Sequence, residues 1–204
     1  GICCSSTEES NMYWGRHICD TLIHSEFDEE VFKNFVAQQR RINSKVSKTI
    51  NSFALLEDCM YSGVLKKNKD IRGCFFNGRH WGIFLVVTMQ YVLDLPPELR
   101  SNVDFVFVLR NNVKMDREKI WKHFAGFVPS FQLFEQLMNK CTQGYECMVI
   151  NNTVRSNEMC DCLSWYEATI RDKFKIGKDA MWIYHYQMRK QEEEEESDDD
   201  FQLA

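Results

Sequence analysis

Short, nearly continuous apolar runs alternate along this chain with segments whose apolar residues recur every three or four positions. Continuous runs of this length are typical of buried strands, and the longer spacing is typical of helices with one apolar face. We therefore expect strands at Ile2–Cys4, Cys19–His24, Phe53–Cys59, Gly82–Gln90, Val103–Leu109, Tyr145–Ile150 and Leu163–Ala168.

Helices are expected between these strands. The clearest begins after Asp28, a good N-cap residue, and its apolar face holds Val31, Phe32, Phe35, Val36 and Ile42. Further helical segments are expected at Asn68–Asn77, after Pro96–Pro97, from Asp116, and around Phe131–Met138. Strands and helices in alternation predict an α/β fold with a mostly parallel sheet.

Length and charge divide the chain into a folded body and a tail. A chain of 204 residues that is 44% hydrophobic can bury one sizeable core, which we expect over residues 1–190. Residues 191–204 contain five glutamates and three aspartates, which predicts a disordered acidic tail or a segment that docks on a basic partner. Removing that −8 from the net charge of −5 leaves the body at +3, which permits contact with DNA.

Cysteine usage favours a reducing compartment. The nine cysteines form neither a disulfide framework nor a CxxC pair. A zinc site built from Cys141, Cys147, Cys160 and Cys162 is an alternative, although its spacing is irregular. The apolar runs are far shorter than the about 20 residues of a membrane span, so no membrane insertion is expected.

Two acids follow the apolar run Phe53–Leu56, which is the pattern of a Walker B strand. Such a strand delivers carboxylates to its C-terminal edge, where open α/β sheets bind ligands. Glu57 is a candidate to hold Mg²⁺, and Asp58 is a candidate to bind the metal or polarise an attacking water. The plainer alternative is an ordinary strand that ends in acids.

A glutamine and three arginines add candidates for phosphate chemistry. Gln90 ends the next apolar run and could orient water or sense a γ-phosphate, or it could simply cap the strand. Arg79 and Arg110, with Arg100 as a third candidate, could reach a phosphate in a neighbouring subunit or could form surface ion pairs.

The order of the motifs LLEDCMYSG, NGRHWGIFLVVTMQY and LPPELRSNVDFVFVLR resembles the DNA-packaging ATPases of nucleocytoplasmic large DNA viruses, in the FtsK/HerA branch of P-loop motors. The resemblance continues through YECMVINN, CLSWYEA and FKIG and covers nearly the whole chain. It implies a RecA-like P-loop core that acts as a homo-oligomeric, hexameric ring. Such a ring would use ATP and Mg²⁺ to drive double-stranded viral DNA into a capsid, in the virion or the viral factory of the host cytoplasm.

Carried onto this sequence, the resemblance makes Glu57 and Asp58 the Walker B acids, Gln90 the sensor, and Arg79 or Arg110 an arginine finger. The family usually has Asp where this chain has Glu57. Glu57 and Gln90 would contact the nucleotide, and Glu57 and Asp58 the metal.

The phosphate-binding Walker A loop of that family is absent from these residues, so the core is expected to be incomplete at its N-terminus. Three explanations stay open: a truncated ATPase, a shortened relative that acts only as a DNA- or capsid-binding assembly module, or a loop supplied by another chain. Under each of them we expect this chain to be inactive as an ATPase by itself.

Overall fold

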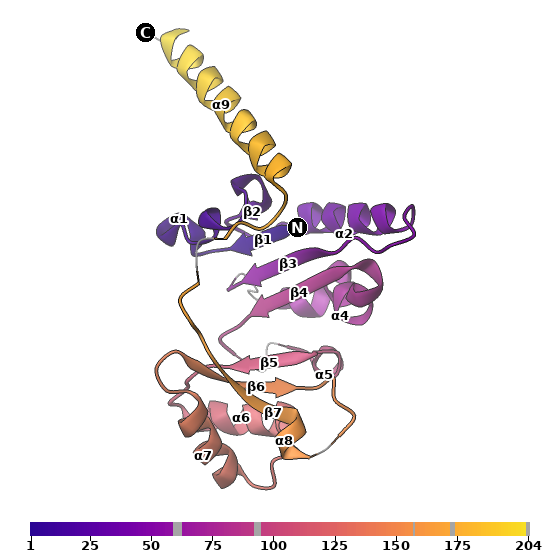
Figure 1. Ribbon diagram of the computed structural model, residues 1–204, viewed down its shortest axis with the longest axis vertical. Coiled ribbons are helices and arrows are strands. Elements are labelled where there is room, and N and C mark those ends of the chain that lie inside the picture. Colours follow the sequence, from indigo (N-terminus) through magenta and orange to yellow (C-terminus); the bar gives the residue numbers. More distant parts are fainter. Residues whose placement is uncertain (59–62, 92–94, 157, 172–173, 203–204) are drawn as a thin grey trace. The chain divides into compact units, whose positions relative to one another are not determined.

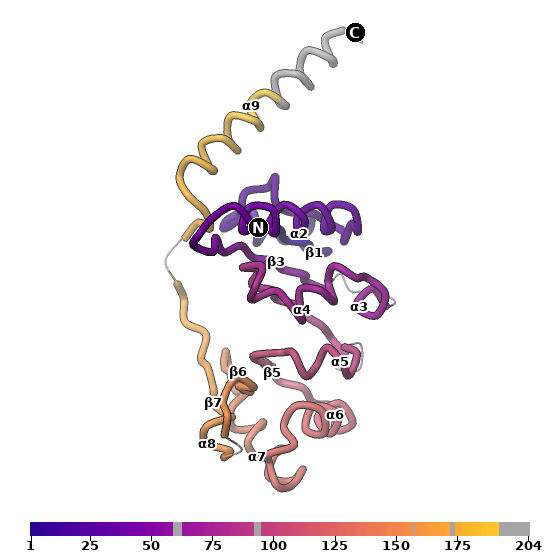
Figure 2. The backbone as a smooth tube through the Cα atoms, turned by 90° about the vertical axis from the view of Figure 1, so that its right-hand side faces the viewer, coloured from indigo at the N-terminus to yellow at the C-terminus, as the bar shows by residue number. Residues whose placement is uncertain are grey.

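The strands of this chain form two separate sheets, each in its own compact unit. The first unit comprises residues 1–59, 84–88 and 171–204, and the second comprises residues 60–83 and 89–170. The computed structural model describes residues 1–58, 63–91, 95–156, 158–171 and 174–202, with side chains to residue 191. Figures 1 and 2 show these elements within each unit.

A four-stranded sheet forms the centre of the first unit. It contains β1 (Ile2–Ser5), β2 (Ile23–His24), β3 (Ser52–Glu57) and β4 (Ile83–Thr88), in the order β2-β1-β3-β4. β1 pairs in parallel with both β2 and β3, and the arrows of β3 and β4 point the same way in Figure 1. The predicted α/β class and mostly parallel sheet are therefore confirmed.

Helix α2 (Glu29–Asn43) packs its apolar face into this unit. The Asp28 side chain accepts hydrogen bonds from the backbone N–H groups of Glu30 and Val31, as expected for an N-cap. Phe32 and Val36 are buried, while Ile42 remains 36% exposed. The helix covers the predicted segment, but its apolar face ends before Ile42.

The C-terminal segment returns to the first unit. The core around Cys3, Ile18 and Leu55 includes Ile176, and Trp182 of α9 (Asp179–Gln202) is 6% exposed. Three short helices complete this unit: α1 (Glu8–Asn11), η1 (Trp14–Arg16) and η2 (Asp20–Leu22). α9 continues through the acidic run as far as Gln202. The predicted disordered tail covers residues 191–204, and most side chains of that segment lie outside the described residues.

The second unit is built on an antiparallel sheet. β5 (Phe105–Val108), β6 (Glu146–Asn151) and β7 (Leu163–Glu167) lie in the order β5-β6-β7. Helices α6 (Lys114–Phe124) and α7 (Phe131–Cys141) pack on it through a core that includes Val108, Ile120, Phe134, Met148 and Ile150. The remaining helices of this unit are α3 (Val64–Lys67), α4 (Lys69–Trp81), α5 (Pro97–Arg100) and α8 (Met159–Cys162).

Helix α4 corrects the expectation for the NGRHW motif. We expected this helix to end at Asn77 and the motif to lead into a strand, but α4 continues to Trp81 and ends at Gly82, whose φ is 65°. Gly78 is buried inside the helix, where an added Cβ would lie 3.0 Å from the Ile83 carbonyl oxygen. Glycine therefore marks a close approach of the backbone here and does not end the helix.

Among the described residues, no helix combines the length and the hydropathy needed to cross a membrane.

Candidate functional site

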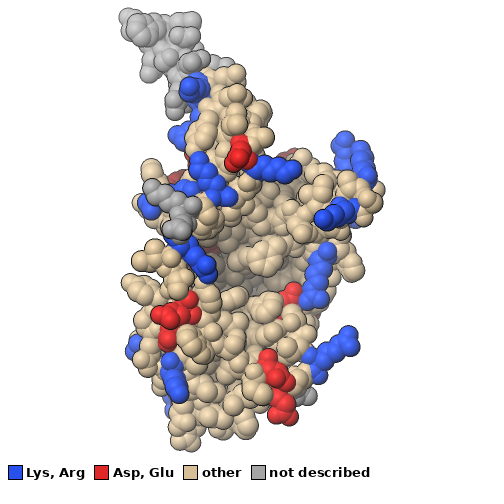
Figure 3. Space-filling view, viewed as in Figure 1, with Lys and Arg blue, Asp and Glu red and all other residues tan. Residues whose placement is uncertain are grey.

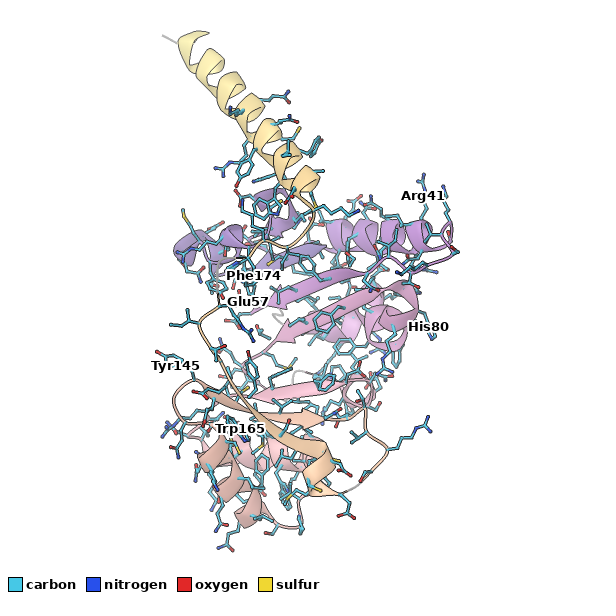
Figure 4. All side chains as sticks on the ribbon, viewed as in Figure 1. Arg41, Glu57, His80, Tyr145, Trp165 and Phe174 are labelled. Atoms are coloured by element: carbon cyan, nitrogen blue, oxygen red, sulfur yellow. The ribbon has the colours of Figure 1, made fainter. Side chains whose placement is uncertain are left out.

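The C-terminal ends of neighbouring strands bring the predicted acids together with two residues that the sequence analysis did not select, Ser5 and Thr88. Ser5 ends β1 directly opposite Glu57, the last residue of β3. The backbone N–H of Asp58 donates a 3.1 Å hydrogen bond to Oγ1 of Thr88, the last residue of β4. Figure 4 places Glu57 at this edge of the sheet. Ligands of open parallel sheets bind at this edge.

Two donors hold one oxygen of the half-buried Glu57 carboxylate. Oε2 accepts a hydrogen bond from Ser5 Oγ at 2.6 Å and another from the indole Nε1 of Trp14 at 2.5 Å. Among the described residues no donor is assigned to Oε1 of Glu57. The carboxylate is therefore oriented through one oxygen, and the other is available to a ligand.

A second carboxylate positions Trp14. The Glu8 carboxylate accepts hydrogen bonds from the backbone N–H groups of Trp14, at 2.8 Å, and Gly15, at 2.7 Å. Thr7, which precedes α1, lies 3.3 Å from Ser5 through their hydroxyl oxygens. The segment that follows β1 thus wraps around the end of β3 and supports Glu57.

Asp58 adopts a left-handed backbone conformation, with φ of 47°. Aspartate tolerates this region better than most residues do. The Asp58 carbonyl oxygen accepts a hydrogen bond from Ser6 Oγ at 3.3 Å, so its backbone is held from both neighbouring strand ends. The chain therefore turns sharply at the second acid of the pair.

This arrangement fits a magnesium ion. Mg²⁺ is commonly bound by one or two carboxylates together with waters and substrate phosphates, and Glu57 has one oxygen without an assigned donor among the described residues. Glu57 and Asp58 would hold the ion at the sheet edge. Across the described part of the chain, no cluster of three or more His, Cys, Asp or Glu side chains forms a metal site, so the zinc alternative gains no support there.

The other predicted site residues lie in the second unit. Gln90 follows the end of β4 by two residues, and its role beside Glu57 stays a prediction. Arg79 lies in the last turn of α4 and pairs with Asp104 through two hydrogen bonds, one of them from Nε at 3.2 Å. The structure thus gives Arg79 a partner within its own unit.

Arg110 and Arg100 each line a surface pocket of the second unit. The Arg110 pocket has a volume of about 420 Å³ and is also lined by Asn139, Thr142, Gln143 and Gly144. The Arg100 pocket, of about 330 Å³, includes His123. Burial, followed by the nearby Arg100 and Lys122 cations, lowers the pKa of His123. Arg110 is exposed, whereas Arg100 is half-buried and its Nε donates to the Leu95 carbonyl oxygen at 2.8 Å. The action of either arginine on a neighbouring subunit stays a prediction.

The supporting residues were missed because they depend on tertiary pairing. Trp14 and Glu57 are 43 positions apart in sequence, and nothing in the local pattern around Trp14 indicates a contact with an acid. The one available signal was Ser5, a polar residue that ends an apolar run just as Glu57 does.

The fold resembles that of a solved viral genome-packaging NTPase. The structure of the genome packaging NTPase B204 from Sulfolobus turreted icosahedral virus 2 with AMPPCP matches with a TM-score of 0.54 and 14% identity, over 84% of this chain and 74% of B204. Its complex with ATP-gammaS matches with a TM-score of 0.53 and 14% identity, over 72% and 68% of the two chains. Similarity at this identity shows the fold alone.

Sequence relatives come from large DNA viruses, and no protein-family model matches the chain. Uncharacterized protein 075L of Invertebrate iridescent virus 6 is 32% identical over 82% of this chain and 63% of its own length. Uncharacterized protein L437 of Acanthamoeba polyphaga mimivirus is 31% identical over 87% and 65%. The chain spans about two thirds of the length of these relatives.

A third relative matches over a larger share of its own length. Uncharacterized protein 088R of Invertebrate iridescent virus 3 is 31% identical over 177 residues, which make up 85% of this chain and 67% of that protein. The chain belongs to the viral protein family that includes protein 088R.

Proposed function

We propose that this chain forms part of an ATP-driven motor of the FtsK/HerA type that moves viral DNA into a capsid. The observation that carries the proposal is the Glu57 carboxylate, oriented by Ser5 and Trp14 at the C-terminal edge of a parallel sheet. The likeness in fold to B204, which has been solved with AMPPCP and ATP-gammaS, supports nucleotide binding by this chain.

In this proposal each predicted residue has a defined task. Glu57 holds Mg²⁺, which would neutralise charge on the nucleotide phosphates, and Asp58 polarises the attacking water. Gln90 orients that water or senses the γ-phosphate. Arg79 or Arg110 reaches the site of a neighbouring copy, where an arginine finger contributes about 10³-fold or more to turnover.

The loop that binds the nucleotide phosphates must come from outside these residues, because the sequence contains no GxxxxGK[ST] segment. We propose that a segment outside this sequence supplies it, either in the same protein or in another chain. The assembly would be a homo-hexameric ring that binds double-stranded viral DNA and capsid or portal components, in the virion or the viral factory.

The test is the ATPase activity of the full-length protein with Glu57→Gln or Asp58→Asn. Both changes keep side-chain size and remove the negative charge, so we expect turnover to fall by about 100-fold or more. Asn also tolerates the left-handed backbone of Asp58. Glu158→Gln, at an exposed position of the second unit, is the matched control and should leave turnover unchanged.

The result also separates the motor from the alternative, an assembly module without catalysis. Undiminished turnover in both variants would remove this pair of acids from the mechanism. A full-length protein that binds DNA but shows no ATP binding by equilibrium dialysis would support the assembly module and reject the motor.

A further inference from the structure

The end of α2 and the loop after it form a surface of one charge sign. Between Glu30 and Glu57 the chain has five lysines and arginines and no aspartate or glutamate. Arg41, Lys45 and Lys48 are exposed, and among the described residues none of them has an acidic partner. Arg41 lies in the last turn of α2, and Lys45 and Lys48 lie in the segment after it. We call these three residues together the basic loop.

Hydrogen bonds close the basic loop onto the helix. The Ile50 carbonyl oxygen accepts from Gln39 Nε2 at 2.6 Å and from Asn43 Nδ2 at 3.1 Å. The Ile50 N–H donates to Asn43 Oδ1 at 2.8 Å. These hydrogen bonds tie the segment that carries Lys45 and Lys48 back to α2, so less conformational entropy is lost when it binds a ligand.

The basic loop lies away from the candidate nucleotide site. The segment that carries Lys45 and Lys48 leads into Ser52, the first residue of β3, whereas Glu57 is the last residue of that strand. The five steps of about 3.3 Å from Ser52 to Glu57 separate the two edges by roughly 17 Å. Figure 4 shows Arg41 at the far end of α2, with its side chain directed away from the sheet, and Figure 3 shows blue side chains at this edge as well as at other places on the same face.

Helix stabilisation explains only part of this charge. Cations in the last turn of a helix interact favourably with its dipole, and this accounts for Arg40 and Arg41. Lys45 and Lys48 lie beyond the helix and gain little from it, because the effect is confined to the last turn. Stabilisation of the helix therefore does not account for these two lysines.

We propose that the basic loop binds the phosphate backbone of duplex DNA. Exposed lysine and arginine side chains without acidic neighbours neutralise phosphates and release counterions, independently of base sequence. The Ser47 hydroxyl, between Lys45 and Lys48 in sequence, can supply a neutral donor, whereas the Ser44 hydroxyl donates to the Arg41 carbonyl oxygen at 2.9 Å. The choice of DNA as the polyanion rests on the function proposed above, whereas the surface itself rests on charge and geometry.

The experiment measures binding of a labelled 30-base-pair duplex to the full chain by fluorescence anisotropy, without nucleotide, at several salt concentrations. The test variant carries Arg41→Gln, Lys45→Gln and Lys48→Gln. The control carries Lys140→Gln, Arg155→Gln and Lys178→Gln, three exposed positions with the same total charge change. Circular dichroism confirms that both variants fold.

If the proposal holds, the test variant binds at least about tenfold more weakly at moderate salt. Its plot of log K against log salt becomes shallower by about 2 to 3, because each lost phosphate contact removes about 0.9 from the slope. The control should retain affinity and slope. An equal loss in both variants would show a diffuse charge effect and overturn the proposal.

Two further outcomes would overturn it. The slope of the test variant could match that of the unmodified chain, or poly-glutamate could bind the loop while duplex DNA does not, which would indicate an acidic protein partner. The DNA-binding assay contains no ATP, so its result does not depend on whether Glu57→Gln lowers ATP turnover. Failure of the basic loop and failure of the motor are therefore distinguishable.

Discussion

The indole Nε1 of Trp14 lies 2.5 Å from Oε2 of Glu57, although 43 positions separate the two residues in sequence. The same oxygen accepts from Ser5 Oγ at 2.6 Å. Glu57 is therefore a carboxylate whose orientation is set by the segment after β1, and that segment is held in turn by Glu8.

Replacing Trp14 with Phe should destabilise the protein. The ring keeps its contacts with the core around Cys3 and Leu55, but Glu57 loses a donor. A hydrogen bond to a charged group contributes about 1.5–3 kcal/mol, so we expect the free energy of unfolding to fall by roughly 1–3 kcal/mol. Urea unfolding followed by far-ultraviolet circular dichroism measures this free energy.

Trp165→Phe, at a residue that is 58% exposed, is the control and should change the free energy of unfolding by less than about 0.5 kcal/mol. Equal effects of the two changes would contradict the structural role of the indole.

The ion pair between Arg79 and Asp104 distinguishes a structural arginine from a catalytic one. The pair is exposed, with 74% and 42% of the two side chains accessible, so breaking it should cost less than about 1 kcal/mol. If Arg79 acts as a finger, Arg79→Gln lowers turnover of the assembled full-length protein by about 10³-fold. Asp104→Asn breaks the same pair and should leave turnover within a few-fold of normal. Equal losses in both variants would instead assign Arg79 a structural role, and no loss in either would leave Arg110 as the candidate finger.

Stability should fall at alkaline pH through Cys74. Burial, with a smaller effect of the Asp70 carboxylate, raises the pKa of Cys74 to about 12, from an ordinary value of 9.0. Above pH 9 the unfolded chain releases this proton while the folded chain keeps it, so the free energy of unfolding falls as pH rises towards 12. The slope of the free energy of unfolding against pH reaches about 1.4 kcal/mol per pH unit for this thiol.

Urea unfolding at pH 8, 9 and 10 should show a weaker pH dependence in Cys74→Ala than in the unmodified chain. Because the substitution also leaves a small cavity, the comparison uses the pH dependence and not the absolute stability. Parallel pH profiles would contradict the prediction.

Opening the basic loop without changing its charge should weaken DNA binding in a different way. Asn43→Ala removes two of the hydrogen bonds to Ile50 and leaves Arg41, Lys45 and Lys48 in place. We expect affinity for the duplex to fall by about three- to tenfold because the loop must be ordered on binding, while the salt slope stays unchanged. Fluorescence anisotropy over the same salt series checks this, with Asn139→Ala as the control. A shallower slope for Asn43→Ala would contradict the proposal, because it would mean that a phosphate contact had been lost.

Local patterns predicted most of the elements. Each apolar run named above contains a strand, but most of the predicted strand Cys19–His24 forms the short helix η2, and only Ile23–His24 is β2. Continuous apolar residues are typical of strands that are buried in a sheet. Asp28 correctly marked the start of α2, since capping depends only on adjacent residues. Strand direction in β5–β7 and the continuation of α4 through Gly78 were not predictable in this way.

The sequence by itself determined the α/β class, the approximate positions of its main helices and strands, and the position of two acids at the end of a buried strand, because periodicity and capping act over a few residues. Only the tertiary structure decided that Ser5 and Trp14 orient Glu57, that Thr88 and Ser6 hold the backbone of Asp58, and that Arg79 pairs with Asp104. Such contacts join residues that are distant in sequence, and they exist only when strand register and helix packing bring those residues within hydrogen-bonding distance.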